Sequence, residues 1–123
     1  EKGMFYYEKG NFRFNNWYSY IDGHNIDYVK GRIALDVEWN SKDQTFDRDL
    51  YAMRTYYECG LISVGIIVTR SEELNTVFDE LGVKSKYGAS TTWMGKLLPR
   101  LDARRHGGCP ILAVGITRRC IVQ

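Results

Sequence analysis

One nine-residue segment constrains the fold of this chain more than any other part of it. Residues 32–40 alternate between two kinds of side chain. Successive residues of a β-strand point to opposite faces of the sheet, so the segment predicts a strand with two unlike faces. One face holds Ile33, Leu35, Val37 and Trp39, and the other holds Ala34, Asp36, Glu38 and Asn40. We expect the apolar face to fix the register, with two carboxylates side by side on the opposite face.

Short strands and turns precede this segment. Eight of the seventeen aromatic residues fall in residues 1–20, where the turn-like residues 8–11 between two aromatic runs predict a hairpin. Residues 20–29 predict a strand that is interrupted by a turn at 23–25. A further turn at 30–31 leads into the alternating strand. Strands joined by tight turns run antiparallel, so we expect antiparallel pairing in this part of the sheet.

Helices and strands alternate in the rest of the chain. Ser41 and Gln44 fit a capping box for a helix that ends at Gly60, and its apolar residues at helical spacing are Phe46, Leu50, Met53 and Tyr57. The elements that follow are a central strand at 61–69 buried on both faces, a helix from Ser71 to Gly82, a helix capped by Ser90 or Thr91 that contains Pro99, and a closing strand at 111–116. Strands connected through helices can run parallel. The fold class predicted is therefore α/β, with a central mixed β-sheet flanked by helices.

Length and composition favour one soluble domain. The 123 residues suit a single core, and 44% apolar with 26% charged residues is ordinary globular composition. The longest apolar stretch, at 61–68, is too short to span a bilayer, so no membrane association is expected. Three widely spaced cysteines fit neither a disulfide framework nor a zinc site, which indicates buried thiols in a reducing cytoplasm: Cys59, Cys109 and Cys120.

The charge is unevenly distributed along the chain. Residues 1–82 carry nine Lys and Arg against fourteen Asp and Glu, a net charge of −5, whereas residues 83–123 carry eight against one, a net charge of +7. Two differently solvated faces would explain this distribution. That is the usual explanation, and the more specific alternative is a polyanionic partner bound by the basic part with a cation bound by the acidic part.

Three carboxylates are spaced to meet at one site. Asp27 lies nine residues before Asp36 across a hairpin turn, and Glu38 lies two residues beyond Asp36 on the same strand face. Carboxylates so close together repel one another unless a cation neutralises them, and oxygen ligands suit Mg²⁺. A solvated acidic strand face is the alternative interpretation.

These residues also carry a resemblance. Asp27 followed by Asp36-Val37-Glu38 resembles the PD-(D/E)xK nuclease signature, and residues 36–50, 62–70, 90–97 and 107–110 resemble the BglII/BstYI branch of type II restriction endonucleases. The resemblance implies a homodimer that cuts double-stranded DNA at a short palindrome with a GATC core. In that family, Glu commonly occupies the position of Asp36. The position of Glu38 is occupied by Gln in the family and by Lys in the wider superfamily.

The resemblance implies a role for each acidic residue. Asp27, Asp36 and Glu38 would be the catalytic residues. Mg²⁺ would lie between Asp27, Asp36 and the scissile phosphate, with the carbonyl of Val37 as a further ligand, while Glu38 positions or deprotonates the attacking water. The expected products carry a 5′-phosphate and a 3′-hydroxyl. No nucleotide-binding loop is present in the sequence, so no nucleotide cofactor is expected.

A DNA-binding surface is expected along the basic segment. Phosphate contacts hold the duplex without reading its sequence, and the candidates for them are Lys96, Arg100 and Arg104. The candidates for base contacts are Asn40, Lys42, Ser90, Thr91 and Thr92. For each of these residues, a helix cap or a solvated turn is the alternative role.

We expect one nuclease domain over residues 1–123, either complete or short of an N-terminal or loop segment. Two alternatives to a site-specific endonuclease stay open. One is a structure-specific repair or junction nuclease with the same core. The other is a catalytically inert DNA-binding dimerisation module, which Glu38 at the usual Lys position would favour.

Overall fold

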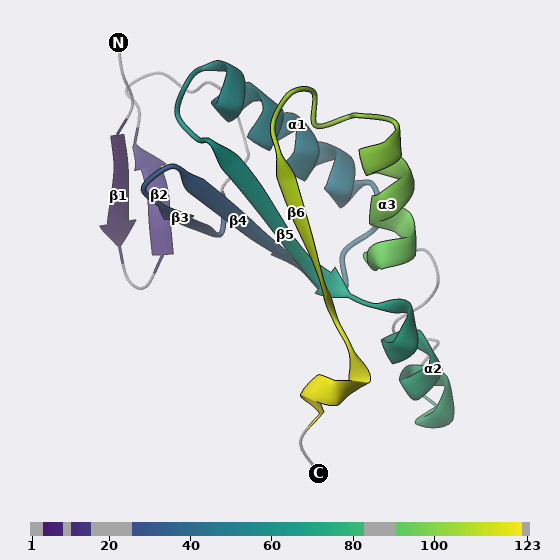
Figure 1. Cartoon of the computed structure of the whole chain (residues 1–123). Coiled ribbons are helices and arrows are strands. Elements are labelled where there is room, and N and C mark those ends of the chain that lie inside the picture. The colour runs from purple at the N-terminus through teal and green to yellow at the C-terminus, as the bar shows by residue number, and fades with distance from the viewer. Residues whose placement is uncertain (1–3, 9–10, 16–25, 83–90, 122–123) are drawn as a thin grey trace.

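A four-stranded mixed sheet forms the centre of the chain (Figure 1). The computed structural model describes residues 4–8, 11–15, 26–82 and 91–121. The strands lie in the order β3-β4-β5-β6, and their bounds are Tyr28–Lys30, Ile33–Glu38, Val64–Arg70 and Ile111–Ile116. β3 pairs antiparallel with β4, whereas β4, β5 and β6 run parallel. This arrangement confirms the predicted α/β class and the mixed sheet.

A separate two-stranded hairpin precedes the sheet. β1 (Met4–Glu8) and β2 (Asn11–Asn15) pair antiparallel around the predicted turn, and β2 lies beside β3 (Figure 1). The predicted hairpin is therefore confirmed. The predicted strand residues 20–25 and Ser90 lie outside the described residues.

Of the three helices, the first and the third pack over one face of the sheet, and the second lies beyond the end of the sheet (Figure 1). Their bounds are Thr45–Glu58 for α1, Glu72–Glu80 for α2 and Met94–Asp102 for α3, and a short 3₁₀ helix, η1, covers Arg118–Cys120. α1 contacts β4, β5 and α3. The apolar core between them includes Ala34, Phe46, Leu50, Ile67 and Leu97, each fully buried. Burial of these side chains is the main force that holds the helices on the sheet.

The sequence predicts the wrong buried face for β4. Ile33 and Val37 are 45% and 42% exposed, whereas Ala34, Asp36 and Glu38 are buried. The reason is that α1 covers the carboxylate face, where hydrogen bonds compensate the cost of burying polar groups. β5 is predicted to be buried on both faces, but only the face of Gly65, Ile67 and Thr69 is fully buried, whereas Val64, Ile66 and Val68 on the other face are half-buried.

The ends of the helices agree with prediction only in part. Gln44 is the N-cap of α1 and makes no side-chain cap hydrogen bond, so the expected capping box is not formed. Gly82, with φ of +70°, ends α2 as expected. α3 starts after Trp93, two residues beyond the nearer predicted cap, and contains Pro99.

The expectation of three buried thiols is also wrong. All three cysteines are free, but only Cys109 is buried, whereas Cys59 and Cys120 are exposed. Both exposed thiols lie just beyond the end of a helix or within η1, where little packs over them.

Candidate active site

Two hydrogen bonds join Asp27 to β4, one to Asp36 and one to Val37. The backbone N–H of Asp27 donates to Oδ1 of Asp36 at 3.0 Å, and the backbone N–H of Val37 donates to Oδ2 of Asp27 at 2.9 Å. Asp27 stands one residue before β3, and Asp36 lies in the paired strand β4. The antiparallel pairing therefore brings together two of the three acidic residues that the sequence spacing selects.

Glu38, the third of these residues, faces the first helix. Its side chain is hydrogen-bonded to the side chains of Asp49 in α1 and of Ser41. Glu38 is 9% exposed and Asp49 only 2%. Since the strand alternates, Glu38 and Asp36 both lie on the face that α1 covers.

Burial and mutual repulsion shift the pKa values of this pair. Burial raises the pKa of Asp49 to about 10, and the hydrogen bond to Glu38 and the charge of Asp36 add to the rise. The pKa of Glu38 is also raised, by burial first, although the hydrogen bond from Asp49 opposes the shift. Both shifts favour the protonated form, so burial and mutual repulsion make this pair hold a proton more readily than two isolated carboxyl groups would.

Asp49 was not among the sequence candidates, although the sequence holds a signal for it. The buried stripe of α1 includes Phe46, Leu50 and Met53, and Asp49 falls within that stripe. A carboxyl group in an apolar helix face is rarely tolerated unless it is paired. Its position in the stripe could have indicated a partner on the covered strand.

The oxygens present suit a hard divalent cation, although they are not arranged around one. Carboxylate oxygens are the donors that Mg²⁺ prefers, and buried Oδ2 of Asp49 has no hydrogen-bond partner. Within residues 26–82 and 91–121, however, no three His, Cys, Asp or Glu side chains are grouped as a metal site. Asp27 Oδ2 already accepts from the N–H of Val37, and Glu38 is hydrogen-bonded to Asp49.

The segment after β4 meets the segment before α3. Lys42 and Thr91 form an isolated antiparallel bridge, and the backbone N–H of Thr92 donates to the carbonyl of Ser41 at 2.9 Å. Four of the five base-reading candidates are thus brought together. Asn40 and Lys42 are exposed, Thr91 is half-buried, and Thr92 is fully buried, so its side chain does not reach the surface.

A buried arginine that the sequence reasoning missed supports this junction. Arg70, at the end of β5, is fully buried; it donates to Oγ1 of Thr91, and its guanidinium lies 5.4 Å from the ring centroid of Phe78. Trp39 meets the same ring edge-on, with centroids 6.5 Å apart. Cation–π and edge-to-face contacts of this kind orient the turn after β4 against α2.

The basic residues of α3 are partly engaged within the protein. Arg100 donates to Oδ1 of Asp47 at 3.0 Å and lies 3.6 Å from Oδ2 of Asp43; its side chain is only 15% exposed. Arg105 also bonds to Asp47. Burial alone would raise the pKa of Asp47, but the hydrogen bonds from the two arginines outweigh it and lower that pKa. This network ties α1 to α3, and Lys96 beside it is half-buried.

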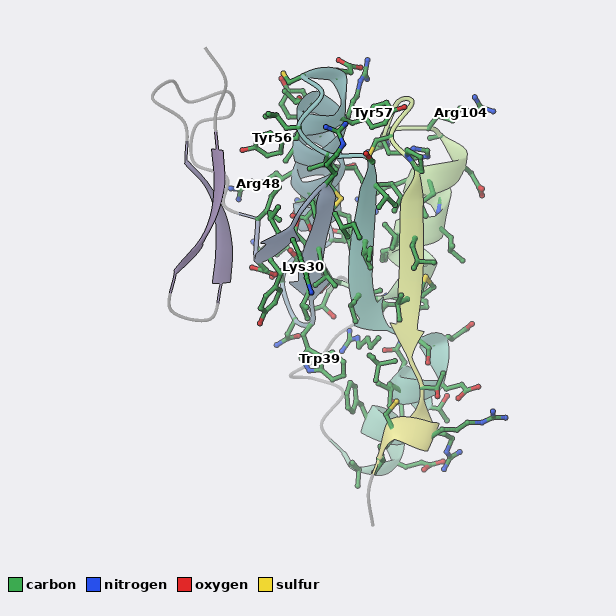
Figure 2. The ribbon with its side chains drawn as sticks, turned by 60° about the vertical axis from the view of Figure 1, so that its left-hand side comes forward. Lys30, Trp39, Arg48, Tyr56, Tyr57 and Arg104 are labelled. Atoms are coloured by element: carbon green, nitrogen blue, oxygen red, sulfur yellow. The ribbon has the colours of Figure 1, made fainter. Side chains whose placement is uncertain are left out.

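Arg104 is exposed but lies away from the candidates for base contacts. Figure 2 shows it near one end of the sheet, whereas Trp39, which directly precedes Asn40, lies near the other. The structure therefore does not bring Arg104 together with the base-reading candidates. None of the helices in the described part of the chain is long and apolar enough to cross a membrane.

The mixed four-stranded sheet with its three helices is consistent with an α/β core of the restriction-endonuclease-like class. A family model described as restriction endonuclease BglII/BglIII matches residues 3–116 of the 123. The chain belongs to this family of type II restriction endonucleases, which are DNA-hydrolysing enzymes that act on double-stranded DNA. A search of curated proteins found no match.

Proposed function

We propose that this enzyme cuts double-stranded DNA at a short palindrome containing GATC, with Mg²⁺ as its cofactor. The observation that carries the proposal is the reciprocal pair of hydrogen bonds between Asp27 and the strand that holds Asp36. These bonds fix two carboxylates next to each other, as a cation beside a DNA phosphate requires. Glu38 lies on the same face of β4 as Asp36.

Each acidic residue has a distinct task in the proposed hydrolysis. Asp27 and Asp36 would hold the cation, with the carbonyl of Val37 as a further ligand, and the bound cation would supply positive charge beside the phosphate. Glu38 positions the attacking water and accepts its proton. Breaking the bond to the 3′ oxygen leaves a 5′-phosphate and a 3′-hydroxyl.

DNA recognition is assigned to two groups of residues. Asn40 and Lys42 are exposed just beyond β4, on the same strand as Asp36, and so are the best placed for base contacts. Ser90, Thr91 and Thr92 complete this group in our proposal, with buried Thr92 acting through the backbone. Lys96, Arg100 and Arg104 would contact phosphates, although Arg100 already pairs with Asp47.

We further propose a homodimer, because two-fold symmetry of the protein would match two-fold symmetry of the site. Each subunit would contribute one nuclease domain spanning residues 1–123. We assign the enzyme to the cytoplasm, where its DNA substrate lies.

Digestion of a plasmid with Mg²⁺, followed by sequencing of the fragment ends, tests the proposal. We expect discrete fragments whose ends share one palindrome, and the exposed Glu72→Gln variant in α2 should give the same fragments. Cleavage confined to branched or damaged DNA would instead indicate a structure-specific nuclease. Binding without cleavage at any Mg²⁺ or Mn²⁺ concentration would indicate an inert DNA-binding module.

A further inference from the structure

We propose that Arg118 and Arg119, which follow β6, bind a phosphate of the DNA backbone that flanks the cleaved bond. The inference rests on the proposed function, because it takes double-stranded DNA as the ligand and the acidic residues of β4 as the place of cleavage. The site is a hollow of about 430 Å³ between η1 and α2, lined by Glu73, Thr76 and the two arginines. Neither arginine was among the sequence candidates, and both lie outside residues 3–116, which match the family.

Two hydrogen bonds hold the walls of this hollow in place. The backbone N–H of Ser71, which directly precedes α2, donates to the carbonyl of Ile116 at the end of β6 at 2.9 Å. The backbone N–H of Arg119 donates to the side-chain oxygen of Thr117 at 3.3 Å, and this bond caps η1. α2 and η1 are in contact, and Figure 1 shows both beyond the carboxyl ends of the parallel strands. The fold therefore defines the hollow before any ligand binds.

The two guanidinium groups are not used by the fold. Arg118 and Arg119 are exposed, and neither side chain forms a hydrogen bond or ion pair with another residue in the described part of the chain. Arg100 and Arg105, in contrast, both pair with Asp47. Adjacent positive charges repel each other, and an anion bound by both removes that repulsion. A phosphate suits this role because its oxygens match the planar donors of arginine.

The distance between the hollow and the acidic strand fits a single DNA duplex. β4, β5 and β6 run parallel, so their carboxyl ends lie at the same edge of the sheet, which is where ligands bind in open α/β sheets. Glu38 pairs with Thr69, and Thr69 with Gly115, so the usual strand spacing places Gly115 about 10 Å from Glu38. Arg118 follows Gly115 by three residues, which adds at most about 11 Å. The total of roughly 20 Å is less than one turn of B-DNA, about 34 Å.

The wall formed by α2 contributes two side chains with opposite effects on an anion. Thr76 carries a hydroxyl group that can donate to a phosphate oxygen. Glu73 carries a carboxylate, which repels a phosphate and weakens its binding in the hollow. Glu72 lies beside Glu73 in the first turn of α2 but does not line the hollow. The two glutamates therefore separate an effect of the hollow from an effect of net charge.

The test compares variants in their binding of a labelled duplex in EDTA, which prevents cleavage, at about 50 to 200 mM salt. The variants are Arg118→Gln, Arg119→Gln and the double variant. Lys30→Gln is the matched control, because it removes an exposed positive charge beside Ile33, at the amino end of β4. All variants should keep the melting temperature within about 3 °C of wild type, because the changed side chains are exposed.

We expect the double variant to bind the duplex about tenfold more weakly and to reduce the slope of log affinity against log salt by about one, as for the loss of one phosphate contact. Each single variant should show part of this loss, and Lys30→Gln should change affinity less than about twofold. Glu73→Gln should tighten binding about two- to threefold, whereas Glu72→Gln should leave it unchanged.

Duplexes with a single uncharged methylphosphonate linkage locate the contact. The wild-type protein should lose affinity when the linkage replaces a phosphate within one DNA turn of the cleaved bond, and the double variant should not respond to the linkage at that position. A wild-type salt slope in the double variant, an equal loss in Lys30→Gln, or the same methylphosphonate profile for both proteins would overturn the inference alone. Failure of the wild-type protein to bind and cleave duplex DNA would overturn the proposed function as well.

Discussion

The backbone N–H of Asp27 lies 3.0 Å from Oδ1 of Asp36, and the carboxylate of Asp27 reaches back to the N–H of Val37. Residues nine apart in the sequence are thus fixed in mutual contact across the β3–β4 turn. Each of the two carboxylates is held by a backbone N–H from the other side of the turn. An asparagine at either position removes the charge but keeps an oxygen that can accept this hydrogen bond, so it separates the effect of charge from the effect of geometry.

Asp27→Asn removes a charge and keeps an oxygen that accepts from Val37. We expect cleavage to fall at least about 100-fold with stability unchanged, because a proposed cation ligand is lost while the hydrogen bond from Val37 remains. Asp27→Ala should lose cleavage equally and also about 1 kcal/mol of stability, the typical contribution of such a hydrogen bond. Urea unfolding measures the stability of the two variants, and single-turnover experiments measure their cleavage. Equal stability of both variants would contradict a stabilising role for the hydrogen bond between Val37 and Asp27.

The raised pKa of Asp49 predicts a pH dependence of stability. The folded state keeps the proton up to about pH 10, whereas the unfolded state releases it near the ordinary aspartate value, roughly pH 4. The contribution of Asp49 to the free energy of unfolding is full below the lower pKa. It declines as pH rises from the lower to the higher pKa, by at most about 1.4 kcal/mol per pH unit for one proton. Asp49→Asn should therefore gain stability relative to wild type between pH 6 and 8. Parallel stability curves for the two proteins would refute the assignment.

Arg100→Ala should loosen the packing of α3 on α1. Its guanidinium bonds to Asp47 and lies near Asp43, and these half-exposed pairs contribute about 1 kcal/mol after solvent screening. Because the pKa of Asp47 is lowered in the fold, this stabilisation is present at neutral pH and is lost as pH falls through that lowered pKa. The variant should thus differ from wild type at pH 7 and converge with it in acid, as followed by thermal unfolding. A constant difference would contradict the ion-pair explanation.

Lys42→Ala and Arg104→Ala should affect DNA binding differently. Lys42 is exposed beside Thr91, close along the chain to Asp36, so its loss should change the preference among related DNA sites. Arg104 lies near the other end of the sheet (Figure 2). Its loss should weaken binding alike for all sequences and reduce the slope of log affinity against log salt by about one. A change of site preference in Arg104→Ala would contradict this division.

Much of the sheet could be predicted because its signals are local. Period-two alternation marked β4, tight turns marked β1–β2 and β3–β4, and the apolar run at 111–116 matched β6. Local patterns also placed Asp27 near Asp36, because the turn between their strands is short. These features depend on neighbours along the chain, which the sequence shows directly.

Local sequence patterns could not predict which face of the sheet is buried. Hydropathy alone favoured burial of the face with Ile33 and Val37, but α1 covers the opposite face and brings Asp49 to Glu38. The pairing of Glu38 with Asp49, and that of Arg70 with Phe78, joins separate elements through tertiary packing. Such compensation of buried charge becomes visible only when the elements are assembled.

The measurement that tests the central claim most directly is single-turnover cleavage of a duplex carrying the recognised site, by wild type and by Asp36→Asn. The asparagine oxygen can still accept from the N–H of Asp27, so the fold and DNA affinity should persist. We predict that the variant binds DNA like wild type and that its cleavage falls below detection at every Mg²⁺ concentration. Wild-type rates of cleavage by purified Asp36→Asn would contradict the assignment of this site.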